Sequence, residues 1–256
     1  MNFSCYSKGM EYKSFDDFWG EFLQVTFHLE NPDLWPSRHH KANWCQKNWK
    51  LKPGSKILDL GCGDGLVSIW LSRMGFEVTG VDRSRTVLNL AREIDDTQNV
   101  NFIVSDLKDV YLHEDSFDAI LFLDASGLMM KSEDSKLLGK AFTWLKPGGK
   151  LVWDCPLIVE ENNSWSQEFP IGLISGKTSF DKEARIQKLE FFLKSKSGDE
   201  YGLQDTAYRA QEKGSGIFRY LYPKREALTM FETVGFVTQE IPHYFPRNYF
   251  ALMGSK

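Results

Sequence analysis

The feature that most constrains this chain is a cluster of three glycines between an apolar run and a helix-like run. In "KILDLGCGDGLVSIWL", residues 56–71, Gly61, Gly63 and Gly65 fill three of five consecutive positions. Only glycine adopts a positive φ without strain and leaves its backbone open to close contact. The pattern therefore predicts a strand that turns sharply into a helix, with a ligand lying directly against the main chain.

Strand-like and helix-like segments alternate regularly around this turn. Strands are predicted at 56–61, 76–82, 100–106, 117–124 and 150–156, and helices at 65–75, 85–94 and 133–145. A further helix is predicted at 223–235, with two strands at 236–245 and 248–254. The first five strands are almost continuously apolar, which is typical of a parallel sheet covered on both faces. Right-handed crossovers would wind it into an α/β, doubly wound, Rossmann-like fold.

Two regions flank this predicted core. Residues 1–52 are expected to form an N-terminal helical cap or lid, with an aromatic stripe at Phe15, Phe18, Trp19 and Phe22. Residues 157–222 are expected to form an antiparallel β insert over the active site, with a hairpin around "SGDEYG". The domain prediction is therefore a cap at 1–52 and a core at 53–256 that carries the insert.

Charge and hydropathy exclude some partners. The formal charge is −4 and the pI is about 5.8, so no general basic field attracts a polyanion, and no nucleic acid is expected. Charges interrupt the N-terminal stretch, and no run approaches the roughly 20 apolar residues that span a bilayer. We therefore expect a soluble, cytoplasmic protein with no membrane partner.

The cysteines predict reduced thiols. Cys5, Cys45, Cys62 and Cys155 lie far apart and lack the paired CxxC spacing of a structural zinc site. No metal is therefore expected. A soft-metal site built from the last three thiols remains an alternative, although Cys62 lies in the glycine turn, where a small side chain is needed anyway.

The glycine turn is also one of five motifs that occur together. "ILDLGCGDG", "VTGVDRS", "VNFIVSD", "FDAILFLD" and "LKPGGKLVWDCP" follow in the order and at the spacing of the class I S-adenosylmethionine-dependent methyltransferase family, which this chain resembles. The resemblance implies a seven-stranded sheet whose last strand is antiparallel and inserted near the edge. It also implies S-adenosylmethionine as cofactor and S-adenosylhomocysteine as product.

The resemblance further implies which residues hold the cofactor. The methionine part would face four residues of the glycine turn, namely Asp59, Gly61, Cys62 and Gly63. A cationic ammonium and sulfonium favour carboxylate and carbonyl oxygens as neighbours. Arg38, in the segment before the first strand, is a candidate for binding the cofactor carboxylate.

The adenosine part would be bound by the next two strands. Asp82 would accept both ribose hydroxyls, for which a carboxylate's two oxygens are well suited, and Arg83 would line the adenosine. Asp106 and the backbone of Leu107 would bind the adenine amine. An alternative left open is that the two aspartates merely cap the helices that follow them. Leu123, with Asp124, would face the cofactor amine and the entering substrate.

Methyl transfer from a sulfonium is an in-line displacement that needs alignment, exclusion of water and a base for the acceptor's proton. His39 and His40 lie in the predicted lid, "DLWPSRHHKANW". His243 and Tyr244 lie in "IPHYFPRNYF", where the last strands can reach the cleft. These four residues are the predicted catalytic candidates.

The substrate class is predicted from what the fourth strand and the insert contain. "LDASG" lacks the prolines and the aromatic residue of enzymes that methylate nucleic-acid bases. The insert is rich in aromatics, which favours a closed pocket for a small molecule methylated on nitrogen or oxygen. Two alternatives are a methyltransferase acting on protein or RNA and a non-catalytic binding protein on the same scaffold.

Overall fold

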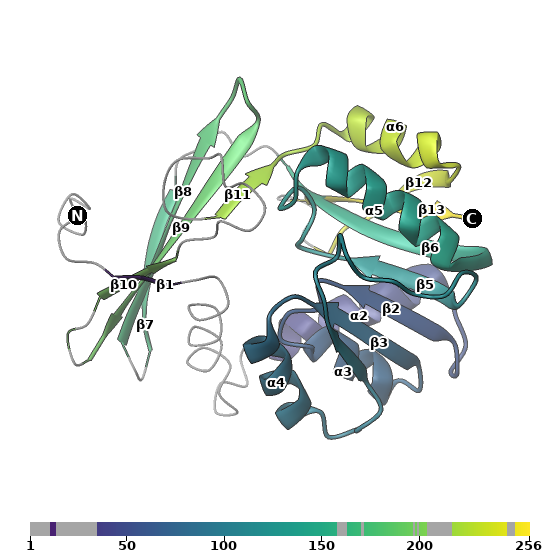
Figure 1. The fold of residues 1–256 in the computed structure, drawn as a ribbon, viewed down its shortest axis with the longest axis horizontal. Coiled ribbons are helices and arrows are strands. Elements are labelled where there is room, and N and C mark those ends of the chain that lie inside the picture. The colour runs from purple at the N-terminus through teal and green to yellow at the C-terminus, as the bar shows by residue number, and fades with distance from the viewer. Residues whose placement is uncertain are drawn as a thin grey trace.

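The structure is a computed structural model that describes residues 11–13, 35–157, 163–169, 172–196, 198, 200–203, 217–244 and 249–256. These residues form two separate sheets and the helices that pack on the larger one (Figure 1). The predicted aromatic stripe of the N-terminal cap lies outside the described residues.

The larger sheet contains, in the described part of the chain, seven strands in the order β12-β13-β6-β5-β2-β3-β4. Their bounds are β2 (Lys56–Leu60), β3 (Glu77–Asp82), β4 (Asn101–Val104), β5 (Phe117–Phe122), β6 (Leu145–Pro156), β12 (Val237–Ile241) and β13 (Tyr249–Ser255). Strand β13 is antiparallel to both of its neighbours, and the other pairs are parallel. The predicted Rossmann-like sheet with an antiparallel last strand is therefore confirmed.

Helices cover both faces of this sheet, as the apolar strands require. Helices α5 (Lys131–Trp144) and α6 (Lys224–Val234) pack on one face, where the Trp153 and Phe231 rings stack 5.2 Å apart. Helices α2 (Trp35–Trp49) and α3 (Leu66–Arg73) cover the other face. Helix α4 (Arg85–Ile94) packs beside β4. Among the described residues, none of these helices has the length and apolar character needed to cross a membrane.

The insert forms the second sheet, which extends away from the core (Figure 1). Its strands are β7 (Asn163–Phe169), β8 (Gly172–Asp181), β9 (Ile186–Ser195), β10 (Glu200–Leu203) and β11 (Ile217–Tyr220), with β1 (Glu11–Lys13) at the edge. The antiparallel pairing of β9 with β10 confirms the predicted hairpin around "SGDEYG". Because β1 pairs in parallel with β10, part of the N-terminal segment joins the insert.

The aromatic residues predicted for the insert differ in their exposure. Trp165 is 40% exposed, and its ring lies 6.4 Å from that of Phe191. The half-buried members are Phe180, Phe191, Phe192, Phe218 and Tyr220. The side chains of Phe169 and Tyr201, and all of Tyr208, lie outside the described part.

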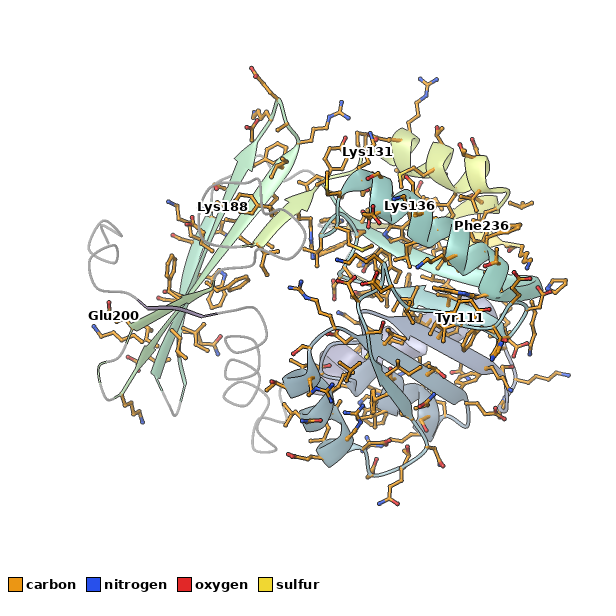
Figure 2. All side chains as sticks on the ribbon, viewed as in Figure 1. Tyr111, Lys131, Lys136, Lys188, Glu200 and Phe236 are labelled. Carbon is orange, nitrogen blue, oxygen red and sulfur yellow. The ribbon has the colours of Figure 1, made fainter. Side chains whose placement is uncertain are left out.

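Contacts at the end of β11 tie the insert to the core. The Tyr220 amide donates to the carbonyl of Gly127, in the loop after β5, at 2.8 Å. Its hydroxyl donates to Glu226 of α6 at 3.0 Å. Lys131, labelled where α5 begins in Figure 2, pairs with the same glutamate and lies 5.3 Å from the centre of the Tyr220 ring. These contacts hold β11 against the carboxyl ends of the core strands.

The glycine turn supplies a first prediction, on stability. Gly65 has φ +70°, and a Cβ atom there would lie 2.7 Å from the Phe102 ring and 2.8 Å from Cβ of Ala91. Gly65→Ala should therefore lower the free energy of unfolding by roughly 2 kcal/mol, from left-handed strain and crowding together. Gly63→Ala is the matched control, because a Cβ at that position meets no atom within 4 Å. Urea unfolding of both variants measures the difference, and equal losses would contradict this role of Gly65.

Candidate active site

The site lies at the edge where the carboxyl ends of the parallel strands meet. Residue pairs across the sheet place Asp59 of β2 beside Leu121 of β5, and Leu121 beside Val152 of β6. Two residues further along each strand, Gly61, Leu123 and Asp154 therefore lie at one level. Because neighbouring strands are about 4.8 Å apart, the glycine turn and Asp154 are roughly 10 Å apart with β5 between them.

The glycine turn is fixed to the neighbouring strand by its backbone. The amides of Gly61 and Cys62 both donate to the carbonyl of Val81, at 2.8 and 3.0 Å. The Gly63 amide donates to Oδ2 of Asp82 at 3.0 Å. Gly63 has φ +53° and open space where a side chain would begin. The turn is therefore shaped to let a ligand approach its backbone, as the sequence predicts.

Asp59 is a buried carboxyl beneath this turn. It is 5% exposed and accepts a 2.6 Å hydrogen bond from the Ser68 hydroxyl. Burial raises the pKa of Asp59 to about 6, against the stabilising effect of the Ser68 hydroxyl on its charged form. A cation placed nearby would therefore stabilise the charged form of the Asp59 carboxyl.

Asp82 lies where the glycine turn meets the end of β3. Its Oδ1 accepts from the Ser84 amide at 2.9 Å, while Oδ2 accepts from Gly63. The N-cap of α4 is Ser84, whose hydroxyl accepts from the Val87 amide at 3.3 Å. The alternative in which Asp82 caps this helix is therefore wrong, since Ser84 does so. Arg83, between them, is half-buried.

The end of β4 forms a tight turn. Oδ1 of Asp106 accepts from the Lys108 amide at 3.0 Å, and its carbonyl accepts from the amides of Asp109 and Val110. Leu107 is 7% exposed and packs beneath Gly61. These residues lie on the same sheet edge as the glycine turn and Asp82, as predicted.

On the other side of β5, a group of polar side chains is packed between α2, β6, β11 and β13. We name it the Asp154 cluster, and its members are Lys41, Asp124, Asp154, Arg219, His243, Tyr244 and Tyr249. Asp154 and His243 are 0% and 6% exposed. Buried polar groups at such density are costly unless they are paired, so this cluster is a candidate functional site.

Asp154 organises the cluster. Its Oδ1 accepts from the Asp124 amide at 2.7 Å. Its Oδ2 accepts from the Tyr244 hydroxyl at 3.2 Å and lies 3.3 Å from Nε2 of His243. Burial, followed by the negative charge of Asp124, raises the pKa of Asp154, while the bond to His243 favours its charged form. The pair of Asp154 and His243 can therefore hold a proton away from bulk water.

Aromatic rings and a lysine enclose this pair. The His243 ring stacks on Tyr249 at 5.0 Å and lies 3.9 Å from the Tyr244 ring. Trp44 of α2 donates from its indole to the Pro242 carbonyl at 2.6 Å, which fixes the loop that carries these residues. Burial raises the pKa of Tyr244, so its phenol stays protonated and acts as a hydrogen-bond donor.

Lys41 and Asp124 form an ion pair at the rim of the cluster. The lysine side chain is 6% exposed and that of the aspartate 42%. Asp124 has φ +58°, a conformation that aspartate adopts more readily than most residues. The buried cation of α2 in this site is thus Lys41, three residues beyond the predicted Arg38, whose side chain lies outside the described part.

The structure separates the four predicted catalytic candidates into two groups. His243 and Tyr244 meet at Asp154, whereas His39 packs on the Trp70 ring at 4.4 Å, towards α3. His40 is exposed. Sequence reasoning missed Lys41, Asp154, Arg219 and Tyr249. Only Asp154 had a local signal, as a carboxyl inside the apolar run "KLVWDCP".

The described cysteines do not form a common site. Cys45, Cys62 and Cys155 are buried in three different apolar clusters. Burial raises the pKa of all three thiols, so they remain neutral. Within the described ranges, no three His, Cys, Asp or Glu side chains are placed to hold a metal ion.

The strand order, the glycine turn and the carboxylates at the next strand ends together define a methyltransferase fold of the S-adenosylmethionine-dependent kind. Residues 57–149 match the family described as "Methyltransferase domain", in agreement with the resemblance of the five motifs to the class I S-adenosylmethionine-dependent methyltransferases. The family recognised from the five motifs is confirmed.

Curated relatives match only part of the chain. Phosphoethanolamine N-methyltransferase 1 of Arabidopsis thaliana is 34% identical over 105 residues, which are 40% of this chain and 21% of that protein. Ubiquinone biosynthesis O-methyltransferase of Coxiella burnetii is 32% identical over 140 residues, 54% of this chain and 56% of that protein. The chain thus spans about a fifth and about half of these relatives.

A solved structure resembles a larger share of the chain. It is the S-adenosylmethionine-bound amino pentose methyltransferase CalS10 of Micromonospora echinaspora, involved in calicheamicin biosynthesis. The TM-score is 0.63 at 18% identity, covering 84% of this chain and 91% of that one. This likeness supports the shared fold.

Proposed function

We propose that this chain transfers a methyl group from S-adenosylmethionine to a nitrogen or oxygen atom of a small molecule. The observation that carries the proposal is the buried pair of Asp154 and His243 at the sheet edge that also holds the glycine turn. One side of β5 provides a place for the cofactor, and the other provides a base for the acceptor. The named small-molecule relatives, one an N- and one an O-methyltransferase, support the substrate class.

The residues present fit the cofactor. The open backbone at Gly63, the buried carboxyl of Asp59 and the carboxylate of Asp82 suit a cation and a ribose diol. In the proposed arrangement Arg83, Asp106 and Leu107 line the adenosine. When bound, S-adenosylmethionine supplies an electrophilic methyl group.

His243 is the proposed base. A neutral imidazole that donates from Nε2 to Asp154 carries its lone pair on Nδ1, where a proton from the acceptor can be taken up. Asp154 then stabilises the imidazolium that forms. The hydroxyl of Tyr244, half-buried beside this pair, orients the carboxylate.

The direct test is an isotope-transfer assay on a small-metabolite panel. Purified chain is first titrated with S-adenosylmethionine by calorimetry, and then incubated with tritiated cofactor and candidate amines, phenols and alcohols. We expect saturable cofactor binding and transfer of label to a small acceptor. Binding without transfer to any panel member, together with labelling of a protein or RNA fraction, would contradict the proposal.

Asp82→Asn should weaken cofactor binding without unfolding the chain. The single oxygen of asparagine can still accept from the Gly63 amide, although the bond from the Ser84 amide is lost. The variant also lacks the negative charge that favours hydrogen bonds from the two ribose hydroxyls. Hydrogen bonds to charged groups contribute about 1.5–3 kcal/mol, so the dissociation constant should rise roughly 10- to 100-fold. Calorimetry measures it, and exposed Asp109→Asn is the control. An unchanged constant would remove Asp82 from the binding site.

A further inference from the structure

Arg219 is a buried cation to which the proposed reaction gives no role. It lies in β11, the strand that joins the insert to the core, and it is 8% exposed. One terminal nitrogen donates to the backbone carbonyl of Asp124, and the guanidinium also donates a hydrogen bond to the Tyr249 hydroxyl. In the described part of the chain, its Nε–H group is buried without a hydrogen-bond partner.

Two carboxylates of the Asp154 cluster, those of Asp124 and Asp154, lie near this guanidinium without contacting it. Its two hydrogen-bond partners are both neutral. One is a backbone carbonyl, and the other is the Tyr249 phenol, which stays protonated because burial raises the pKa of Tyr249. The carboxylate of Asp124 pairs with Lys41 instead. Among the described residues, none forms an ion pair with Arg219. A buried guanidinium with no carboxylate in direct contact and one unbonded donor is unfavourable, so an anionic oxygen that accepts from this Nε–H would be stabilised here.

The position of Arg219 indicates where that anion comes from. Its partners follow β5 and begin β13, which puts it on the β6 side of β5 with the Asp154 cluster. The proposed cofactor residues Gly63, Asp82 and Asp106 lie on the β2 side. The acceptor must approach the proposed base, and Arg219 bonds to Tyr249, whose ring stacks on that base.

Neighbouring backbone contacts hold the arginine in place. The amide of Tyr220 donates to the Gly127 carbonyl at 2.8 Å, and the amide of Leu221 donates to the Arg185 carbonyl at 2.9 Å. The strand that carries Arg219 is thereby fixed on its C-terminal side. A fixed guanidinium suits planar recognition of a carboxylate or phosphate.

We propose that Arg219 binds an anionic group of the methyl acceptor, a carboxylate or a phosphate, so that the substrate is an anionic small molecule. This inference rests on the proposed function, since it takes the Asp154 cluster as the acceptor side of the site. Arg219 selects the acceptor by its charge and orients it towards His243.

The first experiment uses inorganic phosphate and acetate as probes. Chain loaded with S-adenosylhomocysteine is titrated with each anion at constant ionic strength, and the arginine Nε–H signals are followed by ¹H–¹⁵N correlation spectroscopy. We expect a saturable shift of the Arg219 signal, and loss of at least about nine-tenths of the anion affinity in Arg219→Gln. Exposed Arg225→Gln should bind the anions like the parent chain.

Three outcomes would overturn the inference. They are the absence of a saturable shift in the loaded chain, unchanged anion binding in Arg219→Gln, and anion binding that disappears when S-adenosylhomocysteine is added. The last would assign the guanidinium to the cofactor carboxylate. If the parent chain fails to bind S-adenosylhomocysteine in calorimetry, the proposed function fails instead, so the two failures are distinguishable. Should Arg219→Gln not fold, Arg219→Lys keeps the charge and should bind phosphate roughly tenfold more weakly.

The second experiment uses acceptors in matched pairs that differ only in a carboxylate or phosphate group. The parent chain should methylate the anionic member of a pair with a kcat/KM at least about 100-fold higher. In Arg219→Gln, the KM for that member should rise by roughly the same factor with little change in kcat. Equal use of both members, or a fall in kcat alone, would contradict recognition by Arg219.

Discussion

Replacing His243 with glutamine should lower kcat by about 10²- to 10⁴-fold, the usual contribution of a general base. Cofactor affinity should not change, because the residues proposed to bind the cofactor lie on the other side of β5. Nε2 of His243 lies 3.3 Å from Asp154, so the glutamine amide can keep the bond to the carboxylate while losing the basic nitrogen. Steady-state kinetics with an acceptor from the panel, together with calorimetry of cofactor binding, measure the two effects separately.

Controls separate a chemical role of His243 from a structural one. Exposed His113→Gln should leave kcat unchanged. His39→Gln and His40→Gln test the other two candidates, and each should lower kcat by less than about tenfold if His243 is the base. A His243→Gly variant should regain activity when imidazole is added, which a purely structural residue would not allow. If His39→Gln lost as much activity as His243→Gln, this result would contradict the role of His243 as the base.

The pH profile of this site should also change. The pair of Asp154 and His243 must have released one proton before it can accept one from the substrate. The plot of kcat against pH should therefore rise on its acidic side, the acidic limb. Because burial raises the pKa of Asp154, this limb should lie above the usual range of an aspartate. Asp154→Asn should shift the limb to lower pH and lower kcat, since the imidazolium loses its counter-charge. An unaltered limb in this variant would assign the titration to another group.

The core fold was predictable because its signals are local. Each of the first five strands, such as "KILDLG", is apolar over its own length, and each helix shows its own spacing of apolar residues. The alternating order of these strands and helices therefore indicates a parallel sheet. The glycine spacing likewise depends on a few adjacent positions. The antiparallel last strand came from the family resemblance and not from periodicity.

The Asp154 cluster was only partly predictable, because its members become neighbours through the sheet order. Lys41 and Arg219 are 178 positions apart in the sequence and contact the same residue, Asp124, only because α2 and β11 both reach the end of β5. Nothing local distinguishes Lys41 from Arg38 in "RHHKANW". His243 and Tyr244 were found because the last predicted strands bring them to the cleft, but their partner Asp154 comes from a different strand.

Asp59→Asn should make the folded chain more stable at alkaline pH. The pKa of this carboxyl is about 6 in the folded chain and 3.8 in its ordinary state, so the folded state binds the proton more tightly than the unfolded one. The contribution of Asp59 to stability is therefore complete below pH 4 and is lost as the pH rises through 6. At 1.36 kcal/mol per pKa unit, ionised Asp59 costs the folded state about 3 kcal/mol at pH 8.

The asparagine variant removes this cost, because its neutral amide oxygen can still accept from the Ser68 hydroxyl. Urea unfolding should show a gain of about 3 kcal/mol over the parent chain at pH 8 and almost none at pH 3.5. The control for the substitution itself is Asp109→Asn, at an exposed position. A variant less stable than the parent at pH 8 would mean that Asp59 is already neutralised by a cation.

The same substitution should weaken S-adenosylmethionine binding by about tenfold at pH 8, because an ammonium group near Asp59 would lose its counter-charge. Stability and affinity would then change in opposite directions in one variant. Such opposition is expected where a buried charge is kept for a ligand and not for the fold. If Asp59→Asn left both quantities unchanged, the carboxyl would be neutral in the parent chain and the cofactor's ammonium would require another partner.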